Sequence, residues 1–384
     1  MKPIHLFLPT YRVEECLEQI RECLESGWTG LGFKTTEFER AWTEYTELPH
    51  AHFVNSATAG LHLALRVFKH LDHWSDGDEV ITTPLTFVAT NHAILYEGLK
   101  PVFADIDEYL CLDPHSIVDR LNQRTRAVMF VGFGGNAGRL AEVAAICKER
   151  GLRLILDAAH MTGTRMKGRH VGAEADVSVF SFHSVKNLPT ADGGMLCFQE
   201  KRADDLARRL SWLGISKDTF SRSSSLGGYK WHYDVEQVGF KYHGNSIMAA
   251  LGLVGLRYLD QDNAYRRQIA AWYDQALLKE GVETVPVSPE CEPSRHLYQI
   301  LVDRRDEVML ALNEELIYPG VHYRDNREYP MYAEQLSTCP RAANASQRLI
   351  SLPMHLGLTH ADVGRVCNGV AKAVARTRLA KGLS

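Results

Sequence analysis

The sequence predicts an α/β fold with a mainly parallel sheet, followed by a smaller α+β domain. Between residues 50 and 200, short apolar or β-branched runs alternate with segments of helical periodicity. Strands separated by helices pair in parallel through right-handed crossovers. At about 150 residues per domain, 384 residues suit a large domain with an appendage. We expect a large domain over residues 1–250, whose N-terminal segment can pack on a small domain over residues 251–384.

Seven runs have the composition of strands, and in chain order they are AHFVN, DEVITT, KPVFADI, TRAVMFVGF, LRLILDAA, ADVSVFSF and GGMLCF. The first five are separated by the helical segments SATAGLHLALRVFKHL, FVATNHAILYEG, DPHSIVDRLN and RLAEVAAICKERG. After residue 245 we expect one or two long amphipathic helices, a strand in HLYQILVD, and helices in DEVMLALNEEL and ADVGRVCNGVAKAVARTRLA. Parallel sheets bind ligands beyond the carboxyl ends of their strands, so the residues after each run are candidates for chemistry.

The composition argues against several classes of partner. The chain carries 43 Lys and Arg against 47 Asp and Glu, scattered along its length, and so lacks the basic surface of a nucleic-acid-binding protein. No stretch of about 18 apolar residues could span a membrane. The eight cysteines form no CxxC pair and no zinc-type cluster, which is typical of reduced thiols. We expect a cytoplasmic protein without nucleic-acid, membrane or metal partners.

One candidate site is a glycine-rich turn after the run AVMFV. Gly132, Gly134 and Ala137 form the pattern GxGxxA, and the next strand-like run ends at Asp157. Such a turn can hold a dinucleotide, with the acid on a ribose hydroxyl. A glycine turn after a strand also occurs for steric reasons alone, and this one lies in mid-chain. An NAD(P)-dependent oxidoreductase is therefore one alternative function.

A second candidate site combines four separate strand ends. Ser56 or Thr58 can cap a helix whose N-terminus binds phosphate, and Phe87 can stack on a flat ring. Asp157 ends a buried strand, where the desolvation of its carboxylate requires a partner. Lys186 directly follows another such run, VSVFSFHSV. Taken singly, each of these features has an ordinary explanation: the cap can be a plain helix cap, the phenylalanine a core residue and the lysine a surface residue.

Together these four features suit one cofactor, pyridoxal 5′-phosphate (PLP). It requires a lysine for a Schiff base, a carboxylate against its pyridine nitrogen, an aromatic ring against its face and a helix N-terminus for its phosphate. The dinucleotide hypothesis explains Asp157 but gives Ser56, Phe87 and Lys186 no role.

Segments along nearly the whole chain resemble the DegT/DnrJ/EryC1/StrS family of PLP-dependent sugar aminotransferases. The matching segments are SGWTGLGFKTTEFERAW, FVNSATAGLHLAL, GDEVITTPLTFVATNHAILYEGLKPVFADID, LDAAHMTGTRMKGRHVG, FSFHSVKNLPTADGGML, HGNSIMAALGLVGL, VHYRDN and SLPMH. The resemblance implies a fold type I enzyme, similar to aspartate aminotransferase, with a mainly parallel seven-stranded sheet flanked by helices.

The resemblance also implies roles for individual residues. The implied catalytic residues are Lys186, which holds the cofactor covalently, Asp157 at the pyridine nitrogen and His160 near the cofactor's 3′-oxygen. Phe87 is implied as the aromatic residue that stacks on the ring. The further cofactor contacts, most of them to the phosphate, are Ser56, Ala57, Thr58, Ser181 and, from the partner subunit of a homodimer, Lys241.

The chain departs from the family pattern at three places. Lys241 and His243 stand where many members have Asn and Arg, and the segment TADGG replaces the usual TGEGG. Gly132 replaces a common histidine, which suggests a roomier or differently lined pocket. On this interpretation the glycine-rich run is a loop on the sugar side of the site.

The implied reaction is a transamination in which pyridoxamine phosphate carries the amino group from L-glutamate to a keto sugar. The implied acceptor is a nucleotide-linked 3-keto or 4-keto-6-deoxy sugar, on a route to surface polysaccharide such as lipopolysaccharide O-antigen. An unactivated ketose, a cyclitol ketone, or a non-catalytic protein that binds the cofactor are open alternatives. Candidate sugar contacts, each equally consistent with a surface or loop-stabilising role, are Thr29, Lys34, His183, His322, Tyr323, Arg324 and His355.

Overall fold

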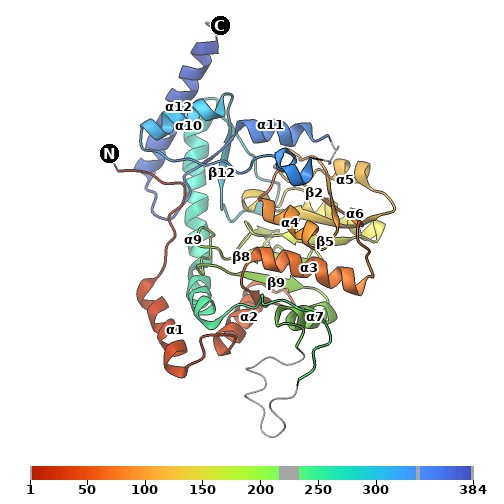
Figure 1. Cartoon of the computed structure of the whole chain (residues 1–384). Helices are drawn as coiled ribbons and strands as arrows, with labels where there is room; N and C mark the ends of the chain where they lie inside the picture. The colour runs from red at the N-terminus through yellow and green to blue at the C-terminus, as the bar shows by residue number, and fades with distance from the viewer. Residues whose placement is uncertain (1, 216–232, 334–337, 382–384) are drawn as a thin grey trace.

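The computed structural model describes residues 2–215, 233–333 and 338–381. Within this part of the chain, the largest sheet has seven strands in the order β1-β9-β8-β5-β4-β2-β3 (Figure 1). The neighbours from β8 to β3 are parallel, whereas β9 is antiparallel to both β8 and β1. The expectation of a mainly parallel seven-stranded sheet is confirmed.

The strands of this sheet are β1 (His52–Val54), β2 (Glu79–Thr82), β3 (Lys100–Phe103), β4 (Thr125–Val131), β5 (Arg153–Asp157), β8 (Val177–Ser181) and β9 (Gly194–Phe198). The helices of this region are α1 (Val13–Ser26), α2 (Phe33–Thr46), α3 (Ala57–Leu71), α4 (Val88–Tyr96), α5 (Pro114–Arg120), α6 (Leu140–Arg150) and α7 (Lys201–Ser211). Most strand residues are buried, because helices cover both faces of the sheet.

The alternation of side chains along β8 shows how each face of the sheet builds its own core. Phe180 points to the face where it packs with Trp42 of α2, at 5.0 Å between ring centroids. The preceding residue, Val179, points to the opposite face and belongs to a second apolar cluster with Leu61 and Phe68 of α3. Successive strand residues face opposite sides, so one apolar run supplies both cores.

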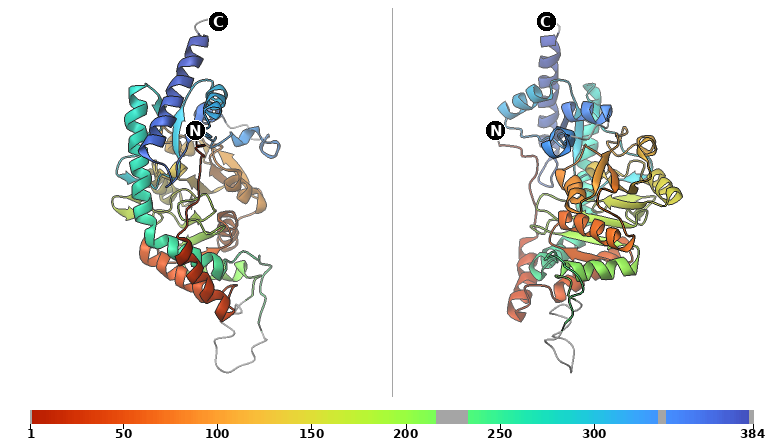
Figure 2. Two further views of the ribbon diagram at one scale, coloured as in Figure 1. Left: turned by 90° about the vertical axis from the view of Figure 1, so that its left-hand side faces the viewer. Right: turned by 45° about the vertical axis from the view of Figure 1, so that its right-hand side comes forward.

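One long helix, α9 (Ser246–Lys279), occupies the stretch where the sequence predicted one or two. The Asn245 side chain caps it by accepting a hydrogen bond from the Met248 N–H group. Figures 1 and 2 show α9 running from α1 and α2 along the large sheet to the C-terminal helices. It therefore connects the two regions as one continuous helix.

The C-terminal region contains a sheet of β10 (Glu283–Thr284), β12 (Tyr298–Leu301) and β13 (Leu349–Leu352) with helices α10 (Arg305–Glu314), α11 (Pro340–Arg348) and α12 (His360–Lys381). A third, small sheet contains β6 (Arg165–Met166), β7 (Arg169–His170) and β11 (Cys291–Glu292). Short 3-10 turns are η1 (Phe133–Gly135), η2 (Asn326–Glu328) and η3 (Pro330–Tyr332). The N-terminal segment joins the C-terminal region, because Ile4 pairs with Ile317 and the Leu6 carbonyl accepts from the Met354 N–H group.

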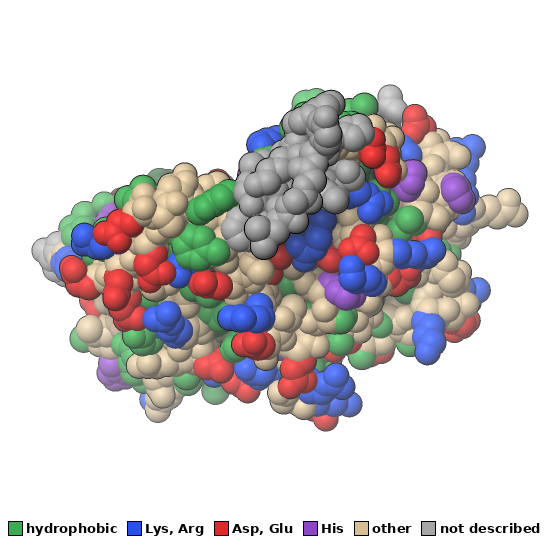
Figure 3. Space-filling model, turned by 90° about the horizontal axis from the view of Figure 1, so that it is seen from below, with side chains coloured by type: hydrophobic (Ala, Val, Ile, Leu, Met, Phe, Trp, Pro, Cys, Tyr) green, Lys and Arg blue, Asp and Glu red, His purple; other side chains and the backbone are tan. Residues whose placement is uncertain are grey.

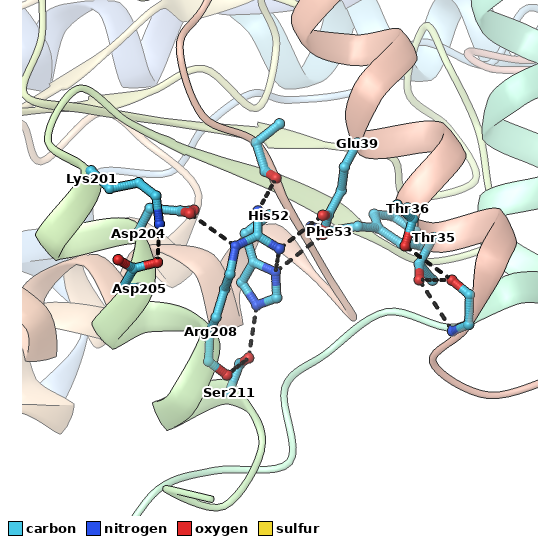
Figure 4. Close-up of polar contacts among 12 residues, drawn as sticks. Thr35, Thr36, Glu39, His52, Phe53, Lys201, Asp204, Asp205, Arg208 and Ser211 are labelled. Atoms are coloured by element: carbon cyan, nitrogen blue, oxygen red, sulfur yellow. Dashed lines mark hydrogen bonds and ion pairs between the residues drawn. The ribbon is translucent and has the colours of Figure 1, made fainter. Parts of the chain in front are cut away.

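A buried polar network fixes the edge strand β1 to α2 and α7 (Figure 4). The His52 Nδ1 atom lies 3.2 Å from a carboxylate oxygen of Glu39, and its Nε2 atom lies 2.7 Å from the Ser211 hydroxyl. Arg208 pairs at 2.8 Å with Glu39 and at 2.8 Å with Asp204. Charged side chains from two helices therefore hold the edge strand in place.

The surface carries charges of both signs. In the view from below, Lys and Arg side chains alternate with Asp and Glu side chains over the described surface, without a broad patch of one sign (Figure 3). Among the described residues, no helix is long and apolar enough to cross a membrane.

Candidate active site

The ends of four strands of the large sheet meet at one cavity of about 300 Å³. Ser56 follows β1, Phe87 follows β2, Asp157 ends β5 and Ser181 ends β8. Lys186 lies five residues beyond β8 and lines the same cavity. These are strand-end positions that the sequence singled out, and the parallel topology brings them to one edge of the sheet.

The N-terminus of α3 forms one wall of this cavity. The Ser56 hydroxyl caps the helix by accepting from the Ala59 N–H group at 3.1 Å. Ala57 and Thr58, in the first turn, also line the cavity. The first N–H groups of a helix have no partner within the helix, and the helix dipole favours an anion there. This wall is suited to a phosphate group.

Two glycines allow α3 to approach the strand ends. A Cβ atom on Gly60 would lie 2.7 Å from Val179 Cγ1 in β8. A Cβ atom on Gly194, in β9, would lie 2.7 Å from the backbone nitrogen of Ala57. Larger residues at either position would push the phosphate-binding wall away from the sheet.

Asp157 supplies a buried carboxylate. It accepts hydrogen bonds from the Thr90 hydroxyl at 2.7 Å and from the Ala159 N–H group at 3.1 Å. Burial raises the pKa of Asp157, and its two hydrogen bonds and the nearby Lys186 oppose this effect. A carboxylate in this setting is stabilised by a cation in the cavity beside it.

Lys186 supplies a partly buried amine. Burial lowers its pKa to about 8, against the opposing attraction of Asp157. A lysine with this pKa is about one tenth deprotonated at pH 7, far more than an ordinary lysine, and the deprotonated amine is the nucleophilic form. Its Nζ atom lies 3.2 Å from Nε2 of His296, which precedes β12 in the C-terminal region.

His160 is held by the glycine-rich turn and by Tyr323. The Gly134 N–H group donates to Nδ1 of His160 at 3.2 Å, so a neutral ring carries its proton on Nε2. That Nε2–H group lies 3.1 Å from the Tyr323 hydroxyl oxygen and donates to it. Burial lowers the pKa of His160 well below its usual value, which keeps the ring neutral. The turn thus fixes which nitrogen of His160 donates into the site.

The glycine-rich turn itself is buried, which corrects two sequence-based interpretations. Val131 lines the cavity, but residues 132–137 are buried beneath it, so they form neither an exposed dinucleotide turn nor a loop on the sugar side. The glycine that stands at position 132 in place of the family's common histidine also does not enlarge the pocket. Met161 fills that space, because a Cβ atom on Gly132 would lie 1.9 Å from its sulfur atom.

The structure separates the predicted sugar contacts into two groups. His183, His322 and Tyr323 line the cavity, with Phe87 5.9 Å from Tyr323 between ring centroids. The other four lie outside the lining of this cavity: Thr29, Lys34, Arg324 and His355.

Three of those four side chains have other partners or border another cavity, and the Lys241 side chain also lies outside the main cavity. Lys34 pairs with Glu22 and Glu37, Arg324 pairs with exposed Glu328, and His355 borders a smaller cavity on another side of Lys186. The Nζ atom of Lys241 lies 3.2 Å from the centre of the Trp212 ring of the same chain.

Sequence reasoning missed several residues that line the cavity, among them Thr90, His296 and Phe7. Thr90 donates to Asp157, His296 contacts Lys186, and Phe7 stacks on His296 at 5.4 Å between ring centroids. Thr90 follows Phe87 by three residues in the first turn of α4, a spacing that could have suggested a shared orientation. His296 and Phe7 come from distant segments, and no local pattern marks them.

The residues present fit PLP. The desolvated Asp157 carboxylate suits a protonated ring nitrogen, and the Lys186 amine suits a covalent bond to an aldehyde. Phe87 is 58% exposed at the cavity, which leaves an aromatic face available for a flat ring. The N-terminal wall of α3 and the Ser181 hydroxyl suit the phosphate.

Comparisons with known proteins agree with this fit. A sequence profile of the DegT/DnrJ/EryC1/StrS aminotransferase family matches residues 11–371. The spore coat polysaccharide biosynthesis protein SpsC of Bacillus subtilis (strain 168) is 37% identical over 380 residues, covering 96% of each chain.

Solved structures agree over nearly the whole chain. The PLP-form of Spr1654 from Streptococcus pneumoniae has a TM-score of 0.89 at 26% identity, covering 98% of this chain and 99% of that one, and a PMP-form is also similar. DesI in the presence of its TDP-sugar product has a TM-score of 0.88 at 26% identity, covering 100% of this chain and 95% of that one. The chain therefore belongs to the DegT/DnrJ/EryC1/StrS aminotransferase family and is a PLP-dependent sugar aminotransferase.

Proposed function

We propose that this enzyme transfers the amino group of L-glutamate to a nucleotide-linked 3-keto or 4-keto-6-deoxy sugar. The observation that carries the proposal is the placement of Lys186 and Asp157 in one cavity beside the N-terminus of α3. Two similar proteins support the sugar class: SpsC is named for spore coat polysaccharide biosynthesis, and DesI was solved with its TDP-sugar product. The amino sugar formed would enter a surface polysaccharide.

Bound in this cavity, PLP supplies an electron sink and carries the amino group between the two substrates. We assign the covalent attachment to Lys186. Once the amine of the substrate has replaced Nζ in that bond, the freed Nζ atom takes a proton from one carbon and returns it to another. Asp157 keeps the ring nitrogen protonated through its negative charge. His160 and Tyr323 orient the side of the ring that bears the 3′-oxygen, because the proton of His160 is fixed on Nε2.

The remaining residues of the cavity bind and orient. Ser56, Ala57, Thr58 and Ser181 are assigned to the phosphate, and Phe87 packs against the ring face. Among the candidate sugar contacts, we retain the three that line the cavity, which are His183, His322 and Tyr323.

We further propose a homodimer in which Lys241 of each chain contacts the phosphate in the partner's site. In its own chain Lys241 is exposed and does not line the cavity. Its segment is anchored to the end of α7, because the Phe240 and Tyr242 N–H groups donate to carbonyls of Leu210 and Ser211. An anchored, exposed lysine that does not line its own cavity suits a phosphate contact across an interface.

The cytoplasm is the proposed location. All eight cysteines are unpaired, as expected in a reducing compartment. Glutamate and nucleotide-linked sugars are assumed to be available to the enzyme there.

The visible absorption spectrum of the purified enzyme tests the proposed donor. We expect a yellow band that L-glutamate bleaches, with one equivalent of 2-oxoglutarate formed per site. Lys186→Ala should still bind PLP through Asp157 and the phosphate wall but should not turn over. A band that L-glutamate leaves unchanged, or near wild-type turnover in Lys186→Ala, would contradict the assignment.

The acceptor is tested with the glutamate-treated enzyme. We expect a nucleotide-linked keto sugar to restore the yellow band and to yield an amino sugar detected by mass spectrometry. Restoration by an unactivated ketose or a cyclitol ketone, and by no nucleotide-linked sugar, would replace the proposed acceptor class while leaving the aminotransferase assignment intact.

A further inference from the structure

Three histidines of the cavity, His160, His296 and His322, lie near the amine of Lys186, and they differ in how their rings are held. Nδ1 of His160 accepts from the Gly134 N–H group, and Nδ1 of His322 lies 2.9 Å from the Ser351 hydroxyl. Nε2 of His296 lies 3.2 Å from Nζ of Lys186. Among the described residues, Nδ1 of His296 has no hydrogen-bond partner. His296 is thus the histidine in direct contact with the lysine, and no described group opposes a proton on its Nδ1.

The position of the His296 ring is fixed by packing. Its side chain is 1% exposed, and the ring stacks on Phe7 with an interplanar angle of 2°. It lies two residues before β12, which pairs with β13 in the small sheet. The ring therefore stays beside Lys186 without the lysine having to hold it.

The surroundings of His296 keep it neutral. Burial lowers its pKa well below the usual value, and positive charge on any of the neighbours Lys186, His160, Arg266 and His322 acts in the same direction. A neutral imidazole with its proton on Nδ1 presents a lone pair at Nε2. Beside an ammonium group, that nitrogen can only accept a hydrogen bond.

We propose that His296 is a positioning residue that accepts a hydrogen bond from Lys186 whenever Nζ carries the proton of the reaction. This proposal rests on the proposed function. In each half-reaction a C–H bond breaks as an N–H bond forms on Nζ, and that N–H bond breaks again as a new C–H bond forms. His296 takes no proton itself. It stabilises the ammonium form and directs one of its N–H bonds, so that another can point to the receiving carbon.

The first test measures the protonation of Lys186 in the full-length chain freed of PLP. Cyanate carbamylates the deprotonated amine, and mass spectrometry of the Lys186 peptide across pH gives the midpoint of its reactivity. In His296→Leu the ring is replaced by an apolar side chain of similar size, so packing against Phe7 is kept while the hydrogen-bond acceptor is lost. We expect the midpoint to fall, because the ammonium form loses its partner. His296→Gln, which retains an acceptor, should restore it toward the wild-type value.

The second test measures the glutamate half-reaction of the PLP-loaded enzyme. A hydrogen bond to a charged group is worth enough that its loss slows kcat about ten- to a hundredfold in His296→Leu. The KM for L-glutamate should change less than about twofold, because the interaction forms only as Nζ takes the proton. His296→Gln should recover a large part of kcat.

His322→Leu is the matched control for the midpoint, because His322 lines the same cavity but bonds to Ser351. We expect the Lys186 midpoint to stay at the wild-type value in this variant. If His296→Leu fails to fold, His296→Met gives the same readout with a flexible apolar side chain.

The outcomes separate the two proposals. An unchanged midpoint in the folded apolar variant, or equal loss in the Leu and Gln variants, would show that His296 acts by packing alone and would overturn this inference. An unbleached yellow band in the wild-type enzyme would instead overturn L-glutamate as donor, while the carbamylation midpoints would still measure the contact between His296 and Lys186.

Discussion

Asp157 is buried and Lys186 is partly buried, and the loss of contact with water moves their pKa values in opposite directions. The pKa of Asp157 is raised, and that of Lys186 is lowered to about 8. Burial thus brings the amine toward its nucleophilic form near neutral pH and makes the carboxylate dependent on a cationic partner. Each residue gains its proposed chemistry from the same low-dielectric cavity.

Asp157→Asn removes the negative charge while keeping the shape of the side chain. Loss of one partner from a buried ion pair costs about 3–5 kcal/mol, which corresponds to a fall in kcat of about two to four orders of magnitude. Stopped-flow measurement of the glutamate half-reaction in the variant and the wild-type enzyme gives this fall in rate. Asp192 lines the same cavity but is exposed, so Asp192→Asn should change the rate by less than about threefold. Equal effects of the two substitutions would argue against the role of Asp157.

Gly132 and Met161 form a second pair that can be tested at the residue scale. The backbone of Gly132 has φ −79°, which alanine tolerates, so Gly132→Ala should act only through the clash with Met161. We expect the free energy of unfolding to fall by about 1–3 kcal/mol, as for other overpacked cores. Urea unfolding of both single variants and of the double variant with Met161→Ala measures the coupling.

The double variant distinguishes a local clash from other effects. Met161→Ala alone leaves a void and should destabilise by about 2–5 kcal/mol. An alanine at position 132 partly fills that void, so the double variant should be more stable than the sum of the single effects predicts. Strict additivity would show that the two side chains do not share the space.

At the scale of elements, α2, β1 and α7 depend on the network around Arg208. Burial raises the pKa of Glu39, but Arg208 and His52 outweigh this, and the net pKa lies below the usual value. A depressed pKa means that ionised Glu39 stabilises the fold at pH values above the usual pKa of a glutamate. This contribution is lost as the pH falls through the lower pKa of the folded state.

Glu39→Gln should therefore destabilise the protein by about 1–3 kcal/mol at pH 7, because Arg208 keeps Asp204 but loses its charge-assisted hydrogen bond to Glu39. The difference from wild type should shrink as the pH falls below about 4. Urea unfolding at several pH values tests both points. Asp205→Asn is the control: it removes an exposed partner of Lys201 on α7 and should change stability by less than about 1 kcal/mol. A Glu39→Gln difference that does not vary with pH would contradict the proposed ion pair.

The periodicity of the sequence predicted most of the elements that carry the site. The runs that became β2, β5 and β8 were recognised because buried parallel strands are continuous apolar runs. The direction of β9, antiparallel to both neighbours, has no local signal, since a strand has the same composition in either direction. For the segment of the long helix α9, the sequence predicts one helix or two, because periodicity cannot show whether a helix bends or stops.

At the scale of the whole molecule, the proposed dimer makes a prediction about mixed subunits. If Lys241 serves the partner's site, a dimer of one Lys186→Ala chain and one Lys241→Glu chain has one intact site and one site with both defects. Each variant alone should have little activity. After random exchange of subunits, the mixture should regain about a quarter of the wild-type activity, because half of the dimers are mixed and each has one working site of two.

Sedimentation of the wild-type enzyme at micromolar concentration accompanies this test and should give a dimer. If the mixture is no more active than its components, Lys241 acts in the site of its own chain. If the enzyme is active as a monomer, the proposed interface is not needed for activity.

The sequence by itself determined the fold class, the family and the residues at the strand ends. Lys186, Asp157, Phe87 and Ser56 could be found because a parallel sheet collects its strand ends at one edge, and residue types there are visible in a single sequence. Tertiary structure alone decided the contacts between distant segments. His296 reaches Lys186 across 110 positions of the chain, and Met161 fills the space above Gly132. Such contacts depend on how the separate elements pack, and no local pattern of residues encodes that packing.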